Sequence, residues 1–453
     1  MKRAFPFASK TCCRPLVIGR AYRDTQSGTR LRNPWTFRNS GERLERIAPS
    51  GELEMNEPAK PARTRMVQAR RRGLAIGVLL VVVPALLLIG ANAPFIPYVG
   101  GYGSLDVSLW SAWLVVLAFA GGALIWICGQ GNVRRFLSAF ALLTVLCAAT
   151  ATFRLIALAR ANNVHVTAAE LFGFTGSLAS VPPDEVVVYA HDLGEALNLL
   201  IYTPKGKPPN GGWPILMYVH GGGWVSESSA ARSADMRWFA NQGLQVLSID
   251  YSLSDKRRHL WDRVTDQIGC AMAWTDANIA SRGGDPSRIS LMGESAGGNL
   301  VINAAYLANA GKLQSSCGGR VPHINAVSAI YPGVDLVAIH NNTYWGAGPD
   351  VKAMVTEYMG GSPQQFPERY AAVASAPKIT PSAPPTLLFI TENDHLVPPD
   401  SMRGFDAKAR QAGVQVRTIS VPYGEHGFDL TGIGNVIVRQ VTWQFLREYG
   451  RDS

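Results

Sequence analysis

The chain has 453 residues, 47 % of them hydrophobic, which is enough for a large buried core and more than one domain. Its formal net charge of +10 comes from residues 1–72, which hold 17 of the 43 Lys and Arg residues but only 6 of the 33 Asp and Glu residues. The rest of the chain is nearly neutral. The composition therefore argues against a folded nucleic-acid-binding face, which would need clustered basic residues.

The first 72 residues form a basic tail rich in Arg, Pro, Ser and Gly. Residues 1–62 have no sustained hydrophobic periodicity, so we expect this part of the tail to be disordered. Met55 and Met66 each offer a later start site, just ahead of an Arg-rich stretch and an apolar segment. The alternative that the tail is not translated therefore stays open.

Residues 73–160 are predicted to form a membrane region. They contain three apolar segments without charge, at residues 74–91, 109–128 and 136–153. At about 1.5 Å rise per residue, each segment is long enough to cross a hydrocarbon core of about 30 Å as a helix. We therefore predict three transmembrane helices, with cleavage of the first segment as a signal peptide as the alternative.

Arginines near the ends of these segments predict the orientation of the chain, because positive residues favour the cytoplasmic side. Arg154 and Arg160 follow the third segment on its predicted outer side, whereas residues 92–104 contain no Lys or Arg. Seven arginines lie on the two predicted inner sides: Arg63, Arg65, Arg70, Arg71, Arg72, Arg134 and Arg135. We therefore expect a multi-pass cell-membrane protein whose residues from 165 onward are extracytoplasmic.

Residues 161–184 are expected to be a polar linker, followed at 185–453 by an α/β domain with a mostly parallel, doubly wound sheet. Apolar runs predict strands at residues 185–190, 197–202, 215–219, 245–249, 288–292, 324–331, 386–390 and 414–421, the first two antiparallel. Helices are expected near residues 231–242, 263–280, 299–310, 401–412 and 436–449. The interval 335–384 lacks a clear strand, and its aromatic residues, including Tyr344 and Trp345, suit either a small cap over an apolar pocket or an ordinary surface excursion.

A Gly-Glu-Ser-Ala-Gly sequence at residues 293–297 joins a predicted strand directly to a predicted helix. This is the context of a nucleophile elbow, in which Ser295 would stand exposed at the tip of a tight turn. A second glycine-rich sequence, His-Gly-Gly-Gly-Trp at residues 220–224, follows another predicted strand and can bring backbone N–H groups close to a ligand. The predicted oxyanion-hole residues are Gly221, Gly222 and Ala296.

An acid and a base are expected to follow the last two strands. Asp394 comes after the strand at 386–390 and is our candidate to orient the histidine, with Glu392 as the alternative and Asp335 as a loop aspartate of structural role. His426 is the one histidine after Asp394 that has a strand before it and a glycine beside it. His395 adjoins the aspartate and could not turn back to it. The order nucleophile, carboxylate, histidine is that of α/β-hydrolases.

On these motifs, residues from about 185 to 450 resemble the α/β-hydrolases of the hormone-sensitive-lipase and bacterial esterase group. The matching stretches are residues 220–224, 248–253, 284–289, 293–298, 394–398 and 426–428. One departure is visible, since the family usually continues Asp-Tyr-Arg-Leu-Ala-Pro where this chain has Asp-Tyr-Ser-Leu-Ser-Asp at residues 250–255. The resemblance implies a serine esterase or lipase-like enzyme that works through an acyl-enzyme intermediate without a cofactor.

Two alternatives stay open: a serine peptidase or amidase of the same fold, and a catalytically silent hydrolase fold that serves as a binding module. The expected partners are a small-molecule or lipid ester and the lipid bilayer, with no nucleic acid. No His, Cys and carboxylate cluster has metal-ligand spacing, so no metal site is predicted. Cys270 and Cys317 are the two cysteines of the α/β region and could pair in an exported domain. The sequence does not predict the oligomeric state.

Overall fold

The computed structural model describes residues 62–343 and 349–450. The chain divides after Lys60, and the unit described below is Pro61–Ser453. The basic tail up to residue 61 lies outside the described residues, as do Tyr344 and Trp345 of the interval expected to be a cap.

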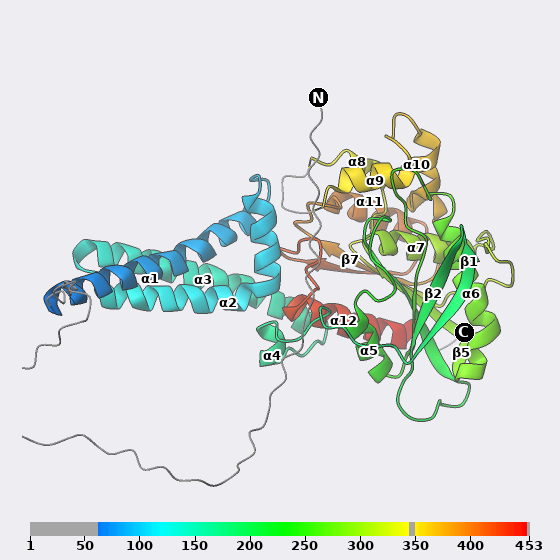
Figure 1. Cartoon of the computed structure of the whole chain (residues 1–453), viewed down its shortest axis with the longest axis horizontal. Coiled ribbons are helices and arrows are strands. Elements are labelled where there is room, and N and C mark those ends of the chain that lie inside the picture. Colours follow the sequence, from blue (N-terminus) through cyan, green and yellow to red (C-terminus); the bar gives the residue numbers. More distant parts are fainter. Residues whose placement is uncertain (1–61, 344–348, 451–453) are drawn as a thin grey trace, which may run out of the picture. The chain divides into compact units, whose positions relative to one another are not determined.

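Three long helices come first: α1 (Ala62–Asn92), α2 (Val99–Cys128) and α3 (Gly131–Ala161) (Figure 1). Each contains one of the predicted apolar segments, and each is long and apolar enough to span a membrane. Small residues let α1 and α2 approach closely, because a Cβ added to Gly77 would lie 2.9 Å from the carbonyl oxygen of Gly121. Large apolar side chains such as Leu86 and Phe119 point outward on the bundle, as residues facing lipid would.

The segment at residues 161–184, expected to be a polar linker, is packed on both sides. It contains a short helix, α4 (Ala168–Leu171), and the Trp113 indole of α2 donates a hydrogen bond to the carbonyl oxygen of Phe172 at 2.9 Å. On its other side, the Thr431 hydroxyl lies 2.9 Å from the carbonyl oxygen of Gly173 and 2.8 Å from that of Thr175. Backbone carbonyl groups of this linker are therefore bonded to the neighbouring elements.

An eight-stranded sheet forms the centre of the α/β region. Its order is β1-β2-β4-β3-β5-β6-β7-β8; β2 is antiparallel to β1 and β4, and the other pairs are parallel. All eight predicted strands and the antiparallel start are confirmed, and β4, β6 and β7 are buried at every residue because both faces of the sheet are covered. The strands are β1 (Glu185–Asp192), β2 (Glu195–Tyr202), β3 (Trp213–Val219), β4 (Gln245–Ile249), β5 (Gly284–Glu294), β6 (Ala326–Ile330), β7 (Thr386–Thr391) and β8 (Val416–Val421).

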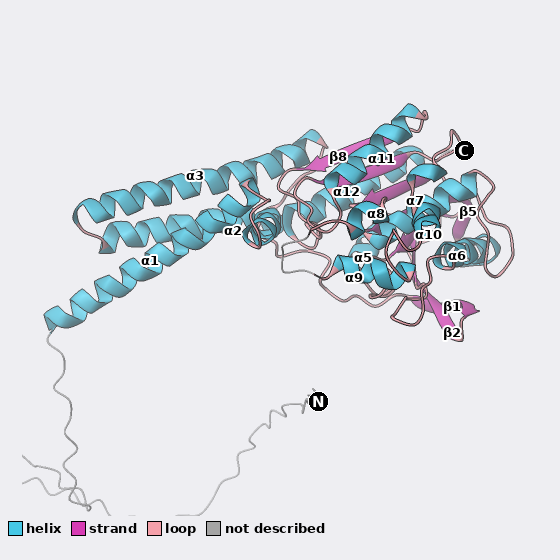
Figure 2. Cartoon of the chain, turned by 90° about the horizontal axis from the view of Figure 1, so that it is seen from above, coloured by secondary structure: helices cyan, strands magenta, loops and turns pink. Residues whose placement is uncertain are grey.

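Helices pack against the sheet in the arrangement expected of an α/β-hydrolase (Figure 2). The five predicted helices are α5 (Ser233–Asn241), α6 (Val264–Asn278), α7 (Ala296–Asn309), α11 (Pro399–Gln411) and α12 (Gly432–Tyr449). Between β6 and β7 the structure adds α8 (Leu336–His340), α9 (Val351–Met359) and α10 (Pro367–Val373).

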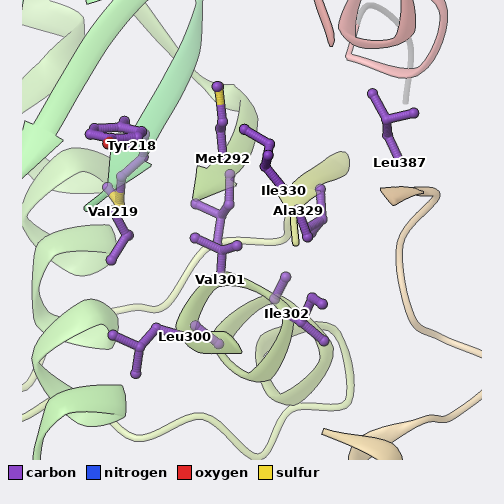
Figure 3. Close-up of a cluster of buried hydrophobic side chains, with 14 of the residues drawn as sticks. Tyr218, Val219, Met292, Leu300, Val301, Ile302, Ala329, Ile330 and Leu387 are labelled. Atoms are coloured by element: carbon purple, nitrogen blue, oxygen red, sulfur yellow. The ribbon is translucent and has the colours of Figure 1, made fainter. Parts of the chain in front are cut away.

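The buried core joins α7 to the middle of the sheet. Figure 3 shows Val301 and Ile302 of α7 on the side of Met292 of β5 and Ile330 of β6, with Leu300 of α7 farther from both. All five side chains are at most 1 % exposed. Burying such a side chain stabilises the fold by about 1.5–3 kcal/mol, so this packing fixes the N-terminus of α7 against the carboxyl end of β5.

Candidate functional site

Ser295 occupies the turn between β5 and α7. Its backbone has φ 54° and ψ −118°, a strained conformation for a residue with a side chain, and its N–H donates to the carbonyl oxygen of Ile330 at 2.9 Å. Two glycines make the turn sterically feasible. A Cβ on Gly293 would lie 2.5 Å from the carbonyl oxygen of Gly297, and a Cβ on Gly297 would lie 2.1 Å from that of Val219. The motif therefore folds as the predicted elbow, with the serine at its tip.

The structure brings together the predicted nucleophile, base and acid, which are Ser295, His426 and Asp394. Ser295 Oγ lies 2.9 Å from His426 Nε2, and His426 Nδ1 lies 2.9 Å from Asp394 Oδ2. These residues follow β5, β8 and β7 at the carboxyl edge of the sheet, where parallel strands present functional groups. The three side chains form one continuous hydrogen-bonded line.

Backbone and side-chain donors hold the Asp394 carboxylate in a single orientation. Its Oδ1 accepts from the amides of Leu396 and Val397 at 2.9 and 2.8 Å, and its Oδ2 accepts from the Thr391 hydroxyl at 2.7 Å as well as from His426. Because both oxygens are committed, the carboxylate cannot rotate without losing hydrogen bonds.

The other candidate carboxylates lie elsewhere. Glu392 is exposed and accepts a hydrogen bond from the Ser420 hydroxyl at 3.0 Å. Asp335 caps α8 by accepting from the amides of Val337 and Ala338, which is the structural role expected of it. Neither residue contacts the candidate base His426.

Burial and a neighbouring charge act in opposite directions on His426. Burial favours the neutral ring and lowers its pKa, whereas the Asp394 carboxylate favours the imidazolium ion and raises it. The carboxylate prevails, so the pKa of His426 is raised above its ordinary value. A base of this kind is well placed to accept a proton from the serine and to hold it as an ion beside Asp394.

The predicted oxyanion donors differ in whether their N–H groups are already bonded. The Gly221 N–H is already used, since it donates to Glu294 Oε1 at 3.1 Å. Within the described residues, the amides of Gly222 and Gly223 donate no hydrogen bond, and Ala296, as the first residue of α7, has no intrahelical acceptor. The free donors beside the serine are therefore those of Gly222, Gly223 and Ala296 instead of Gly221.

Glu294, the residue before the serine, accepts the hydrogen bond that the Gly221 N–H donates. It is buried and accepts from the Tyr218 hydroxyl at 2.7 Å, and Arg232 Nε lies 3.4 Å from the same Oε1. Burial raises the pKa of Glu294 to about 7, although Arg232 opposes the shift. The sequence pattern treated this residue as a variable position of the motif, but it ties the glycine-rich loop to the elbow.

A second buried ion pair was missed from the sequence. Arg232 donates two hydrogen bonds to Asp429, at 2.7 and 3.0 Å, and a third to the Tyr331 hydroxyl at 2.7 Å. The Tyr331 ring lies 4.4 Å from the His426 ring. Arg232 and Asp429 are 197 residues apart, so no local sequence pattern could have indicated the pair.

A cavity of about 500 Å³ opens beside Ser295 and is lined mainly by apolar groups. The Trp224 indole forms part of its lining and stacks on Tyr358 of α9 at 4.8 Å between ring centres. From the interval expected to be a cap, α9 contributes Val351 and Met354. Further lining residues are Leu178, Gly222, Gly223, Ile339, Leu396, Val397 and Leu430.

Cys270 and Cys317 form a disulfide that joins α6 to the loop before β6. In the described part of the chain, no group of His, Cys, Asp and Glu residues has an arrangement that could hold a metal ion.

The sequence of this chain is similar to those of known esterases. Residues 199–408 match the family described as BD-FAE. Esterase LipC of Mycobacterium tuberculosis is 30 % identical over 247 residues, covering 54 % of this chain and 59 % of LipC. The probable carboxylic ester hydrolase LipM of the same organism is 29 % identical over 254 residues, covering 54 % of this chain and 58 % of LipM. The matches thus span less than two thirds of either relative.

A solved structure shares the fold. The truncated form of a carbohydrate esterase from gut microbiota superposes with a TM-score of 0.52 at 21 % sequence identity, and the match covers 61 % of this chain and 100 % of that one.

Proposed function

We propose that this chain, which is an α/β-hydrolase related to bacterial esterases, is a serine hydrolase that cleaves carboxylic esters. The observation that carries the proposal is the hydrogen-bonded line from Ser295 Oγ through His426 to Asp394, with 2.9 Å at each step. Free backbone amides lie beside the serine, and the match to BD-FAE and to LipC supports an ester as the substrate.

The geometry suggests a reaction in two halves. His426 removes the proton of Ser295 as Oγ attacks the ester carbonyl carbon, and the resulting oxyanion accepts hydrogen bonds from backbone amides. The alcohol then leaves with the proton from His426, and the acyl group stays on Ser295. In the second half, water gives its proton to His426 and attacks the acyl-enzyme, and the acid is released as His426 returns the proton to Ser295.

The oxyanion site that we propose consists of Gly222, Gly223 and Ala296. The N-terminus of α7 lies behind Ala296, and its partial positive charge favours the developing oxyanion. Gly222 has φ +89°, and a Cβ there would lie 2.2 Å from the carbonyl oxygen of Ser226, so only glycine fits this position. Gly221 acts indirectly, because its bond to Glu294 holds the loop against the elbow.

We also propose that helices α1, α2 and α3 anchor the enzyme in the cell membrane with the catalytic region outside the cytoplasm. The arginines in the first turns of α1 and α3 favour the cytoplasmic side for these two helix ends. The disulfide between Cys270 and Cys317 supports export, since disulfides persist in oxidising compartments.

Ester cleavage is tested with the full-length protein in detergent and p-nitrophenyl esters of graded acyl length. We expect turnover and labelling by a fluorophosphonate probe, and both should disappear in Ser295→Ala. Labelling that persists in this variant contradicts Ser295 as the nucleophile. Turnover of p-nitroanilides at rates similar to those of the esters would favour the amidase alternative.

Orientation is tested by adding protease to intact spheroplasts. We expect release of a fragment that contains the hydrolase region, because residues from 165 onward would be accessible from outside. Cleavage that requires permeabilised membranes would mean that the catalytic region is cytoplasmic.

A further inference from the structure

The residues on either side of Asp394 are bonded to the membrane helices. Asn393 Nδ2 lies 2.8 Å from the carbonyl oxygen of Ala91 near the end of α1, and 3.0 Å from Ser104 Oγ in α2. His395 Nε2 lies 2.7 Å from the carbonyl oxygen of Pro94, in the turn between α1 and α2. The loop that carries the candidate acid is therefore held at two points by the α1–α2 turn and its flanking helices.

Glu425 extends this connection to the candidate base. Its Oε1 accepts from the backbone amides of His395 and His426, at 2.8 and 3.0 Å, and its Oε2 pairs with the His395 ring. Burial disfavours a charged His395, but Glu425 outweighs this effect and raises the pKa of His395 to about 9. Nε2 donates to the carbonyl oxygen of Pro94 and Nδ1 pairs with Glu425, so both ring nitrogens are bonded.

The loop after β8 is also anchored in the bundle. Tyr423, three residues before His426, is 8 % exposed, and the Arg154 guanidinium lies 5.6 Å from its ring centre. Tyr423 packs into a buried cluster whose other members all come from the three membrane helices: Leu88, Ala91, Val107, Leu114, Ala148 and Ala151. Both loops that carry the candidate acid and base therefore rest on the same helices.

These contacts matter because catalysis depends on placement. Ordering a loop costs backbone entropy, and a displacement of about 1 Å in the reacting groups can reduce the rate about 100-fold. Asp394 is fixed within its own loop by the amides of Leu396 and Val397. Those bonds fix the position of the carboxylate within the loop, whereas Asn393 and His395 fix the position of the loop relative to the helices.

We propose that Asn393 and His395 are positioning residues through which the α1–α2 turn holds the Asp394 loop in register with His426. The membrane bundle is then part of the catalytic apparatus as well as an anchor. This inference rests on the proposed function of Ser295, His426 and Asp394.

Asn393→Asp tests the proposal in the full-length protein, since it keeps the size of the side chain and removes both hydrogen bonds that it donates. We expect kcat to fall tenfold or more while KM for a p-nitrophenyl ester changes less than about twofold. The matched control is Gln444→Glu, which makes the same amide-to-carboxylate change and removes a bond from α12 to the Asn163 carbonyl oxygen at the end of α3. The control should keep wild-type kcat.

A second pair of variants changes the other anchor. His395→Leu removes both ring hydrogen bonds and should lower kcat to a similar degree, whereas His395→Gln keeps a donor for Pro94 and should recover part of the loss. A merely structural role predicts no such recovery and a loss proportional to the unfolded fraction, which limited proteolysis measures. Wild-type kcat in folded Asn393→Asp, or a loss no greater than that of Gln444→Glu, overturns the proposal.

The activities of the wild-type protein and of Ser295→Ala show whether a negative result refutes the positioning role or the proposed esterase function. If the wild type lacks activity that depends on Ser295, the proposed function fails and the positioning role fails with it. If the wild type is active and Asn393→Asp matches it, only the positioning role is refuted.

Discussion

Replacing Asp394 by Asn is the most informative change at the site, because the surrounding donors dictate how the new side chain must lie. The amides of Leu396 and Val397 both donate to Oδ1, so the amide oxygen of the new residue has to occupy that place. Its NH2 group then takes the place of Oδ2, facing Thr391 Oγ1 and His426 Nδ1.

This orientation forces the wrong histidine tautomer. With an NH2 donor opposite it, Nδ1 of His426 must accept a hydrogen bond, and the ring proton moves to Nε2. That nitrogen lies 2.9 Å from Ser295 Oγ and can no longer take the serine proton. In a serine protease with the same type of triad, the wrong tautomer lowers kcat by about 10⁴-fold. We expect a loss of about 10³–10⁴-fold, which corresponds to roughly 4–5.5 kcal/mol of transition-state stabilisation.

The assay is single-turnover acylation of the full-length protein by a p-nitrophenyl ester at saturating substrate. The control is Glu392→Gln, an exposed carboxyl-to-amide change that should cost less than twofold. If Asp394→Asn keeps activity within tenfold of the wild type, the argument from hydrogen-bond orientation is refuted. A large loss in Glu392→Gln instead would transfer the role of the acid to Glu392.

Three further predictions concern pH, the oxyanion site and the disulfide. His426 must be neutral to act as a base, and its pKa is raised, so kcat/KM should increase with pH through an apparent pKa above 6.5. A pH profile of kcat/KM with a midpoint below 6 would contradict this prediction. Gly222→Val keeps the backbone amide but places a Cβ against the carbonyl oxygen of Ser226, so it should displace this oxyanion donor and lower kcat by about 10²–10³-fold, whereas a change in KM alone would mean that the loop only binds substrate. Replacing Cys270 and Cys317 by Ser opens a loop that spans 47 residues and should lower the free energy of unfolding by about 2–4 kcal/mol in a denaturant titration, while kcat stays near that of the wild type.

The strands and the elbow were predictable because their signals are local. Runs such as residues 387–390 are apolar throughout, as expected of strands buried on both faces, and the sheet contains all eight predicted strands. The elbow sequence carries its own steric logic, since Gly293 and Gly297 stand where a Cβ would meet backbone at 2.5 and 2.1 Å. The family resemblance added the order of acid and base, and the match to BD-FAE and to LipC bears out that resemblance.

The sequence could not show that the Gly221 amide is already used, because that bond is a tertiary contact. Three consecutive glycines look equivalent in sequence, and only the position of the Glu294 carboxylate decides which amide is already used. The same limit applies to Arg232 and Asp429, which are 197 residues apart in sequence and meet as a buried ion pair. Charge patterns within a short window carry no information on such pairs.

The contacts of α1, α2 and the turn between them with the Asp394 loop also could not be predicted from local sequence. The sequence divides into an apolar region and a hydrolase region, and this division favours an independent catalytic domain joined to its anchor by a linker. Asn393 and His395 of the hydrolase region nevertheless form hydrogen bonds to α1, α2 and the turn between them. In the sequence, these two polar residues look like ordinary residues of a surface loop. A fragment that begins near residue 165 would leave those groups without their partners and the Tyr423 ring without its apolar cluster. We therefore expect such a fragment to fold around its sheet and still cleave esters far more slowly than the full-length protein.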